Sequence, residues 1–189
     1  MNKLGMLLLE GIQVIGVSAV IIALLNVFII TPQEVRGLSM YPTLHDSDRL
    51  ITEKISYKFN EPSRGDIVVF HFPLDRTQEY IKRVIALPGE KIELKNSKIT
   101  IFNEANPNGL ILNEEYLKPE VITNARAFMK EGEKVEVPKD KYVVFGDNRE
   151  NSSDSRQWGF VEKRDFVGRS IIRYWPPQSF GIMTNPGTK

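Results

Sequence analysis

Residues 79–89 read Glu-Tyr-Ile-Lys-Arg-Val-Ile-Ala-Leu-Pro-Gly. The first part is rich in aromatic and β-branched side chains, which favours a β-strand over Glu79–Ile85, and the Pro-Gly pair predicts a turn after it. Because side chains alternate along a strand, Lys82 and Arg83 lie on opposite faces. One of these two cations must therefore point towards a face that also carries apolar groups.

Further short runs rich in Val, Ile, Phe and Tyr stand between turn residues, and each predicts a strand. They are Arg49–Ile55, Asp66–Phe72, Lys91–Leu94, Lys98–Phe102, Lys134–Val137, Lys141–Phe145 and Val167–Trp175. Asn96-Ser97 suits a hairpin between the third and fourth of these runs. Asn103–Gly109 is predicted as a polar loop, and Asn113–Glu133 is polar and ambiguous. The chain beyond residue 30 is therefore predicted to be mostly β, an antiparallel sheet or a barrel-like domain.

Composition limits the kinds of site. The 189 residues carry 25 basic and 24 acidic side chains, so no nucleic acid partner is predicted. The absence of cysteine excludes disulfides and thiolate metal sites. A histidine-based triad or a multi-histidine metal site would have to use His45 or His71, and neither stands in a recognisable triad setting. We expect no metal and no cofactor.

The N-terminal segment carries a long apolar run. From Gly11 to Ile30 there are 20 residues without a charge, which in a helix at about 1.5 Å per residue span the hydrocarbon core of a bilayer. A cleaved signal peptide has a shorter apolar run and a small-residue cleavage site, which Thr31-Pro32 does not resemble. A buried core helix more often shows one polar face. Residues 1–30 are therefore predicted to contain a transmembrane anchor.

A serine follows this run in the stretch Gly37-Leu38-Ser39-Met40-Tyr41-Pro42-Thr43-Leu44. Gly37 allows backbone angles that other residues avoid, and Pro42 restricts its own φ and the conformation of the residue before it. The stretch predicts a rigid, sharp connection that holds the Ser39 hydroxyl in a set direction. The alternative is an ordinary serine in a Gly/Pro turn.

Two other groups could carry chemistry. Lys82 either extends its amine to water or is buried, and burial lowers the pKa of an amine until it can act as a general base towards a hydroxyl. The second group, Gly146–Arg156, is dense in short hydrogen-bonding side chains. It is either part of a site or an ordinary polar loop full of Asx and Ser turns. Asp154 and Arg156 within it could equally form a surface ion pair of little energetic value.

Taken together, four stretches resemble the type I signal peptidases, the membrane-anchored Ser/Lys leader peptidases of bacteria. They are Gly37-x-Ser39-Met40-x-Pro42-Thr43-Leu44, Arg64-Gly65-Asp66-Ile67-Val68-Val69-Phe70, Lys82-Arg83-Val84-Ile85-Ala86-Leu87-Pro88-Gly89, and Gly146-Asp147-Asn148 with Ser152-x-Asp154-Ser155-Arg156. They occur in the family's order after an N-terminal apolar run. The resemblance implies that Ser39 is the nucleophile and Lys82 the general base.

The resemblance also implies supporting roles in the last stretch. Ser152 matches the serine that orients the lysine. Asp154 and Arg156 match a structural pair beside the site, and Asp147 opens the same stretch.

The activity implied is that of a serine endopeptidase that removes signal peptides from exported pre-proteins at the membrane surface. The oxyanion would be met by the Ser39 N–H and by a donor near Gly37, where some family members carry a serine. The partners would be signal peptides and membrane lipid. The extended substrate is expected to add as a strand to an exposed sheet edge, with small pockets for alternate side chains. The anchor would cross a bacterial plasma membrane once, with the catalytic domain on the outer face.

The expected organisation has three parts. Residues 1–30 form the anchor segment, residues 31–180 the peptidase domain and residues 181–189 a loose tail. The part at about 103–134 is short beside family members with a large second β-domain, so we expect a reduced cap insertion there.

Two rival interpretations remain. A self-cleaving, repressor-type protease shares the Ser/Lys chemistry, but the apolar run and the lack of a DNA-binding N-terminal domain argue against it. A catalytically inert, anchored β-module that binds pre-proteins is the rival of another class.

Overall fold

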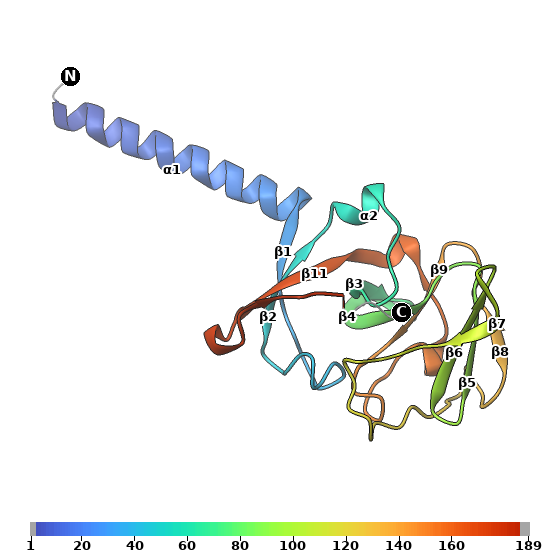
Figure 1. The fold of residues 1–189 in the computed structure, drawn as a ribbon. Helices are drawn as coiled ribbons and strands as arrows, with labels where there is room; N and C mark the ends of the chain where they lie inside the picture. Colours follow the sequence, from blue (N-terminus) through green and yellow to red (C-terminus); the bar gives the residue numbers. More distant parts are fainter. Residues whose placement is uncertain (1–2, 186–189) are drawn as a thin grey trace.

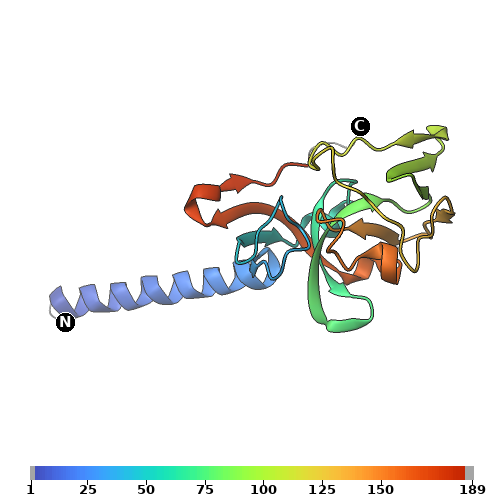
Figure 2. The same cartoon turned by 90° about the horizontal axis from the view of Figure 1, so that it is seen from below.

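The computed structural model describes residues 3–185, and its N-terminal part is a single helix, α1 (Lys3–Phe28). Within α1, Gly5–Leu25 is long and apolar enough to cross a membrane. Figures 1 and 2 show α1 as a straight rod that leaves the β-rich remainder of the chain. A helix that is apolar on all sides and not covered by protein is typical of a membrane span. The predicted helix is present, and its passage through a bilayer stays a prediction.

The larger of two sheets is antiparallel and has the strand order β1-β2-β11-β3-β4-β9-β10, with β12 paired to β11. Its strands are β1 (Ile30–Glu34), β2 (Arg49–Glu53), β3 (Ile67–Phe72), β4 (Asp75–Ala86), β9 (Lys141–Phe145), β10 (Val161–Glu162), β11 (Phe166–Trp175) and β12 (Gly181–Ile182). The mostly β, antiparallel fold is therefore confirmed. The sheet is not a closed barrel, because β1 and β10 are its ends.

The smaller sheet has the order β7-β6-β5-β8 and lies beside the larger one (Figure 1). Its strands are β5 (Lys91–Lys95), β6 (Lys98–Asn103), β7 (Asn106–Ile111) and β8 (Lys134–Glu136). The helical pieces after α1 are the short turns α2 (Ser56–Phe59), α3 (Ser155–Trp158), η1 (Lys163–Asp165) and η2 (Pro177–Ser179). The small sheet thus begins before residue 103. Of its four strands, only β7 lies wholly within the expected cap segment at about 103–134.

Two local predictions differ from the structure. Asn103–Gly109 is not a polar loop, because its second half forms β7, whose Pro107 is tolerated on an edge strand with only one neighbour. The C-terminal residues 181–185 are not loose, because β12 pairs with β11 and Asn185 Nδ2 donates to the Arg64 carbonyl at 2.6 Å. Residues 186–189 of the expected tail lie outside the described residues.

Three clusters of buried side chains form the core, and the one nearest the predicted nucleophile positions it. Val35, Met40, Leu44, Leu50 and Ile67 make up this cluster, and each is at most 5% exposed. Met40 and Leu44 come from the stretch around Ser39. Burying Val35 before the serine and Met40 and Leu44 after it ties the loop after β1 to the large sheet on both sides of Ser39.

Candidate active site

The two residues predicted to do the chemistry lie against each other. Lys82 Nζ is 2.8 Å from Ser39 Oγ and donates to the Ile81 carbonyl at 2.9 Å. Ser39 is half-buried in the loop after β1, whereas Lys82, on β4, is only 3% exposed. The alternative in which the lysine extends its amine to water is therefore wrong.

Burial changes the protonation of this lysine. It lowers the pKa of Lys82 to about 8, because the charged form loses solvation, while the nearby carboxylates of Asp154 and Asp147 oppose the shift. A substantial fraction of the amine is then neutral near pH 8. A neutral amine can donate to the Ile81 carbonyl and still accept a proton from the Ser39 hydroxyl.

The backbone before the serine turns sharply at Gly37, whose φ is +87°. This left-handed conformation favours glycine, as the sequence predicts. The Gly37 N–H donates to Asp46 Oδ1 at 2.6 Å. The prediction that a donor at Gly37 meets an oxyanion is therefore not supported by this geometry, since that N–H is already bound. Asp46 was missed because nothing local marks it as a partner of this turn.

The loop after β9 holds the serine from the other side. Asn148 donates from its backbone N–H to the Ser39 carbonyl and from Nδ2 to the Leu38 carbonyl, both at 3.0 Å. A Cβ on Gly146 would lie 2.3 Å from the Ser39 carbonyl oxygen and 2.2 Å from Ser152 Oγ. Only glycine lets the loop approach this closely. Ser152 is 1% exposed, and its Oγ has no hydrogen-bond partner within residues 3–185, so it is beside the site without a bond to the lysine.

Asp154 and Arg156 form a fully buried, two-bond ion pair. Arg156 Nη2 donates to Asp154 Oδ2 at 2.7 Å and Nε donates to Oδ1 at 2.8 Å. Asp154 Oδ2 also accepts the Gly146 N–H at 3.1 Å. The alternative of a surface ion pair is wrong, because both residues are 0% exposed. The pair fixes the loop that contacts Ser39.

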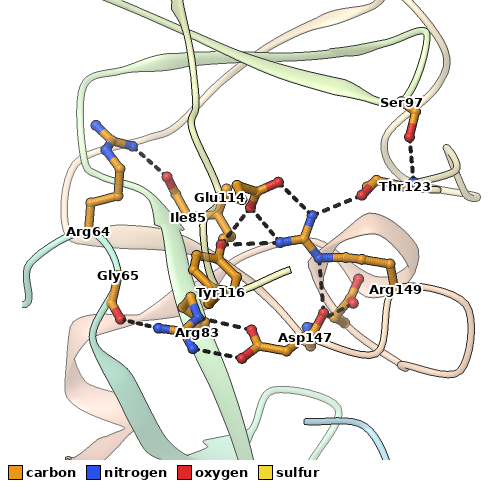
Figure 3. Close-up of polar contacts among 12 residues, drawn as sticks. Arg64, Gly65, Arg83, Ile85, Ser97, Glu114, Tyr116, Thr123, Asp147 and Arg149 are labelled. Atoms are coloured by element: carbon orange, nitrogen blue, oxygen red, sulfur yellow. Dashed lines mark hydrogen bonds and ion pairs between the residues drawn. The ribbon is translucent and has the colours of Figure 1, made fainter. Parts of the chain in front are cut away.

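Asp147 is the centre of a second buried network, which Figure 3 displays. Arg83 donates to it through Nε at 2.9 Å and Nη2 at 2.7 Å, and Thr43 Oγ1 donates to Oδ2 at 2.5 Å. Arg83 Nη1 donates to the Gly65 carbonyl at 2.9 Å. Arg83 and Thr43 were missed as supporting residues. The position of Arg83 beside Lys82 in an apolar strand was the available signal, because a buried cation requires a carboxylate.

The polar segment after β7 completes this network. The Tyr116 ring centroid lies 3.8 Å from Arg83 Cζ, and Arg149 Nη2 donates to the Tyr116 hydroxyl at 3.2 Å and to Glu114 Oε1 at 2.5 Å. Arg149 Nε also donates to the Gly146 carbonyl at 3.1 Å. Figure 3 shows Glu114, Tyr116 and Arg149 meeting beside the Arg83–Asp147 pair. No sequence signal distinguished Glu114 and Tyr116 from the ambiguous stretch around them.

A cleft of about 800 Å³ opens at Ser39 and Lys82, which are both part of its lining. One wall is the edge of β1 and the residues after it, Gln33–Arg36, and the other is Thr77–Lys82 of β4. β9 pairs with β4 only from Arg83 onwards, so the outer edge of the β4 wall is unpaired within the described chain. The cleft therefore has the dimensions of a ligand site and two strand edges as walls.

The other sequence candidates lie apart from this chemistry. Neither histidine forms a hydrogen bond to Ser39 in the part of the chain described, although His71 lines the cleft. The same residues contain no cluster of three or more His, Asp and Glu placed to hold a metal ion.

Comparison with known proteins places this geometry in a family. Residues 8–175 match the family described as signal peptidase, peptidase S26. The chain is 39% identical over 187 residues to a signal peptidase I of Leptolyngbya laminosa, covering 95% of this chain and 85% of that protein. It is 36% identical over 196 residues to signal peptidase IB of Staphylococcus aureus strain MRSA252, covering 95% of each.

A solved structure is also similar, the signal peptidase I of Enterococcus faecalis V583. Its TM-score is 0.46 and its sequence identity 29%, covering 58% of this chain and 97% of that one. The match over residues 8–175 and the identity to full-length relatives establish that this chain belongs to the signal peptidase family, peptidase S26.

Proposed function

We propose that the protein is a membrane-anchored serine endopeptidase that removes N-terminal signal peptides from exported pre-proteins, with Ser39 as nucleophile and Lys82 as general base. The observation that carries the proposal is the 2.8 Å separation of Ser39 Oγ from the amine of a lysine that is only 3% exposed. Family membership and relatives described as signal peptidase I support the same substrate class.

The reaction proceeds in two halves. Neutral Lys82 takes the hydroxyl proton of Ser39 while Oγ attacks the carbonyl carbon before the scissile bond. The proton passes to the leaving amine as the C–N bond breaks, and an acyl ester remains on Ser39. Water then gives a proton to Nζ, attacks the ester carbonyl and releases the carboxylic acid as the proton returns to Oγ. This cycle requires no metal or cofactor.

The supporting residues hold this geometry. Ser152 is proposed to orient the Lys82 amine from its buried position, and the network of Asp147 with the pair Asp154–Arg156 holds the loop against the nucleophile. The Ser39 N–H donates to no acceptor within residues 3–185, so it is free to stabilise the oxyanion. Gly37, the other predicted donor, takes part only after its N–H leaves Asp46.

The substrate is proposed to enter the cleft as a strand between β1 and β4. Ser39 and Lys82 mark one end of the cleft, and Gln33 Nε2, which donates to Glu79 Oε2 at 3.0 Å, marks the other. The second end is nearer α1, because β1 follows that helix directly. A signal peptide carries its apolar segment before the cleavage site, so this segment approaches from α1. The substrate strand then runs parallel to both walls.

The apolar cleft lining near Ser39 and Lys82 is consistent with small substrate residues close to the scissile bond. Val35, Val69 and Ile81 line the cleft there, and Leu50 lines it at the level of Gln33. Alternate side chains of an added strand point to the same face, so the residues at −1 and −3 relative to the scissile bond meet this apolar floor. We expect alanine there to be accepted and phenylalanine to be excluded.

The location is proposed to be a bacterial plasma membrane, crossed once by α1, with the catalytic domain on the outer face and in contact with lipid. Figures 1 and 2 show α1 and the turn between β11 and β12 extending to the same side of the β-rich part. That turn exposes Trp175, Phe180 and Ile182, at 48%, 67% and 74%. Aromatic and apolar side chains at such a position suit the membrane interface.

The test is cleavage of a purified pre-protein by the full chain in lipid vesicles, followed by sequencing of the new N-terminus. We expect cleavage after a small residue, and no cleavage by Ser39→Ala or Lys82→Met. Ser179→Ala and Lys98→Met are matched controls outside the cleft and should cleave normally. Self-cleavage alone would support the repressor-type protease, and a failure of an acylating inhibitor to label Ser39 would support the inert module.

A further inference from the structure

The two ends of the cleft differ in chemistry. Near Ser39 the lining combines the apolar side chains of Val35, Val69 and Ile81 with Arg36, Lys82 and Ser153, whereas the end near α1 is polar. The polar end consists of Gln33, His71, Thr77, Gln78 and Glu79, which we call the polar subsite. Small side chains at −1 and −3 do not require these residues, so the polar subsite has no role in the function proposed above.

Glu79 is the charged group of this subsite, and Glu34, the residue after Gln33, is a second carboxylate in the cleft lining. Its Oε2 accepts from Gln33 Nε2 at 3.0 Å, which is the side-chain hydrogen bond that joins β1 to β4 across the cleft within residues 3–185. No Lys, Arg or His of the described chain forms an ion pair with Glu79, and its side chain is exposed. The cleft entrance therefore carries a carboxylate that lacks a cationic partner.

The pairing of β3 with β4 shows how far along the cleft each side chain lies. Two residues that pair across these strands form a rung. Val69 pairs with Ile81 and His71 pairs with Glu79, so these two rungs share one face of the sheet. At about 3.3 Å per residue, the Ile81 rung lies about 3 Å and the Glu79 rung about 10 Å before Lys82.

A substrate strand parallel to β4 advances at the same rate. The side chain at −3 then lies about 7 Å before the scissile bond, between the two rungs, and the side chain at −5 lies about 13 Å before it, just beyond Glu79. The side chain at −4 points to the opposite face. The side chains at −3 and −5 each lie about 3 Å from the level of Glu79. Since the proposed specificity restricts −3 to small residues, the residue at −5 is the one whose side chain can meet the polar subsite.

We propose that Glu79, supported by Gln33, is a specificity-determining residue that favours a cationic or hydrogen-bond-donating side chain at −5 and disfavours a carboxylate there. The inference rests on the proposed function. A lysine or arginine at −5 reaches the Glu79 carboxylate, while a glutamate at the same position is repelled by it. Gln33 holds the carboxylate over the cleft and leaves Oε1 for the substrate.

The test compares kcat/KM for pre-proteins that differ only in Lys, Gln or Glu at −5. Wild type should cleave the lysine substrate about fivefold better than the glutamate substrate, which corresponds to a partly exposed charge pair. Glu79→Gln should lose the preference and cleave the lysine and glutamate substrates at equal rates. Glu120→Gln removes one carboxylate from an exposed site outside the cleft and should keep the wild-type preference.

The outcomes separate the two proposals. If wild type cleaves none of the substrates, the proposed function itself fails. Cleavage of all three at equal rates overturns only the polar subsite. A preference of the same size in Glu79→Gln also overturns it, and so does a larger charge preference in a matched series at −4, because that side chain points to the other face.

Discussion

At the residue scale, the proposed activity depends on a single lysine, whose buried position disfavours the charged form of its amine. Lys82 is 3% exposed on β4, and burial lowers its pKa to about 8 against the opposing effect of two carboxylates. The proposed role as general base requires both effects, the burial that lowers the pKa and the carboxylates that raise it. A fully charged amine could not accept the Ser39 proton, and an amine without nearby carboxylates would be a weaker base.

The pH dependence of cleavage follows from this pKa. We expect kcat/KM to rise about tenfold per pH unit below pH 8 and to level off above it, as Lys82 loses its proton. Lys82→Arg should abolish cleavage while remaining folded by circular dichroism, because a guanidinium keeps its proton throughout this range. His45→Ala should retain the rate and the profile. A folded Lys82→Arg enzyme with near-normal rates would refute the dyad.

Lys82 also makes stability depend on pH. Its pKa is lowered from 10.5 to about 8, so between these values the unfolded chain binds more protons and the contribution of Lys82 to stability rises with pH. Below pH 8 the buried charge costs roughly 3 kcal/mol. The free energy of unfolding of Lys82→Met minus that of wild type should therefore fall by about this amount from pH 7 to pH 10.5. Lys98→Met should show no such change, and an unchanged difference for Lys82→Met would contradict the buried charge.

At the scale of elements, the segment after β7 lies within the predicted cap insertion and supports the loop that contacts Ser39. Glu114 and Tyr116 contact Arg149 and Arg83, and these arginines bind Gly146 and Asp147 of the loop that holds Ser39 (Figure 3). The position of Ser39, the proposed nucleophile, thus depends on residues far from it in the sequence.

Breaking this support should affect both stability and activity. Glu114→Gln leaves the buried guanidinium of Arg149 without its carboxylate, which should lower the free energy of unfolding by about 3 kcal/mol. We expect kcat to fall more than KM rises, because the loop against Ser39 loosens while the cleft walls remain. Urea unfolding and cleavage kinetics measure the two effects. The neighbouring, exposed Glu115→Gln is the control and should resemble wild type, whereas an equal loss in both variants would exclude a specific role for Glu114.

At the scale of the whole molecule, the anchor and the cleft are joined without a linker. α1 ends at Phe28, and β1, which forms one cleft wall, begins at Ile30. If α1 spans the bilayer as proposed, this short connection holds the proposed active site close to the membrane surface. The exposed apolar turn between β11 and β12 extends to the same side as α1 (Figures 1 and 2).

Contact of that turn with lipid is testable in vesicles. The double variant Phe180→Asn, Ile182→Asn should lower the rate on a vesicle-inserted pre-protein several-fold and leave the rate on a short soluble peptide unchanged, because only the first depends on orientation at the bilayer. Ile111→Asn replaces an equally apolar, exposed side chain on β7, on the smaller sheet, and should leave both rates unchanged. Equal loss on both substrates would contradict lipid contact.

Local chemistry made much of the molecule predictable. The long uncharged run favours an apolar helix, and runs of β-branched residues favour strands, so α1 and the strands β2, β3, β4, β5, β6, β8, β9 and β11 were predicted within a few residues. The short strands β1, β10 and β12 were not predicted. The local pattern at Ser39 also fitted an ordinary turn serine, and Lys82 could have extended its amine to water, so both were assigned roles by the resemblance of four stretches to the family. β7 was missed because Asn106, Pro107 and Gly109 have low strand propensity, and pairing with β6 overrides it.

Contacts between distant segments were decided only by the tertiary structure. The partner of Arg83 is Asp147, 64 residues away, and Glu114 reaches Arg149 across 35. No local sequence pattern predicts such pairs, because a buried cation can pair with any carboxylate that the fold places next to it. The hydrogen bonds from the Gly37 N–H to Asp46 and from Gln33 to Glu79 were likewise decided by the tertiary structure. The sequence by itself determined which residues can do chemistry, and the packing of strands determined their neighbours, their protonation and the cleft between them.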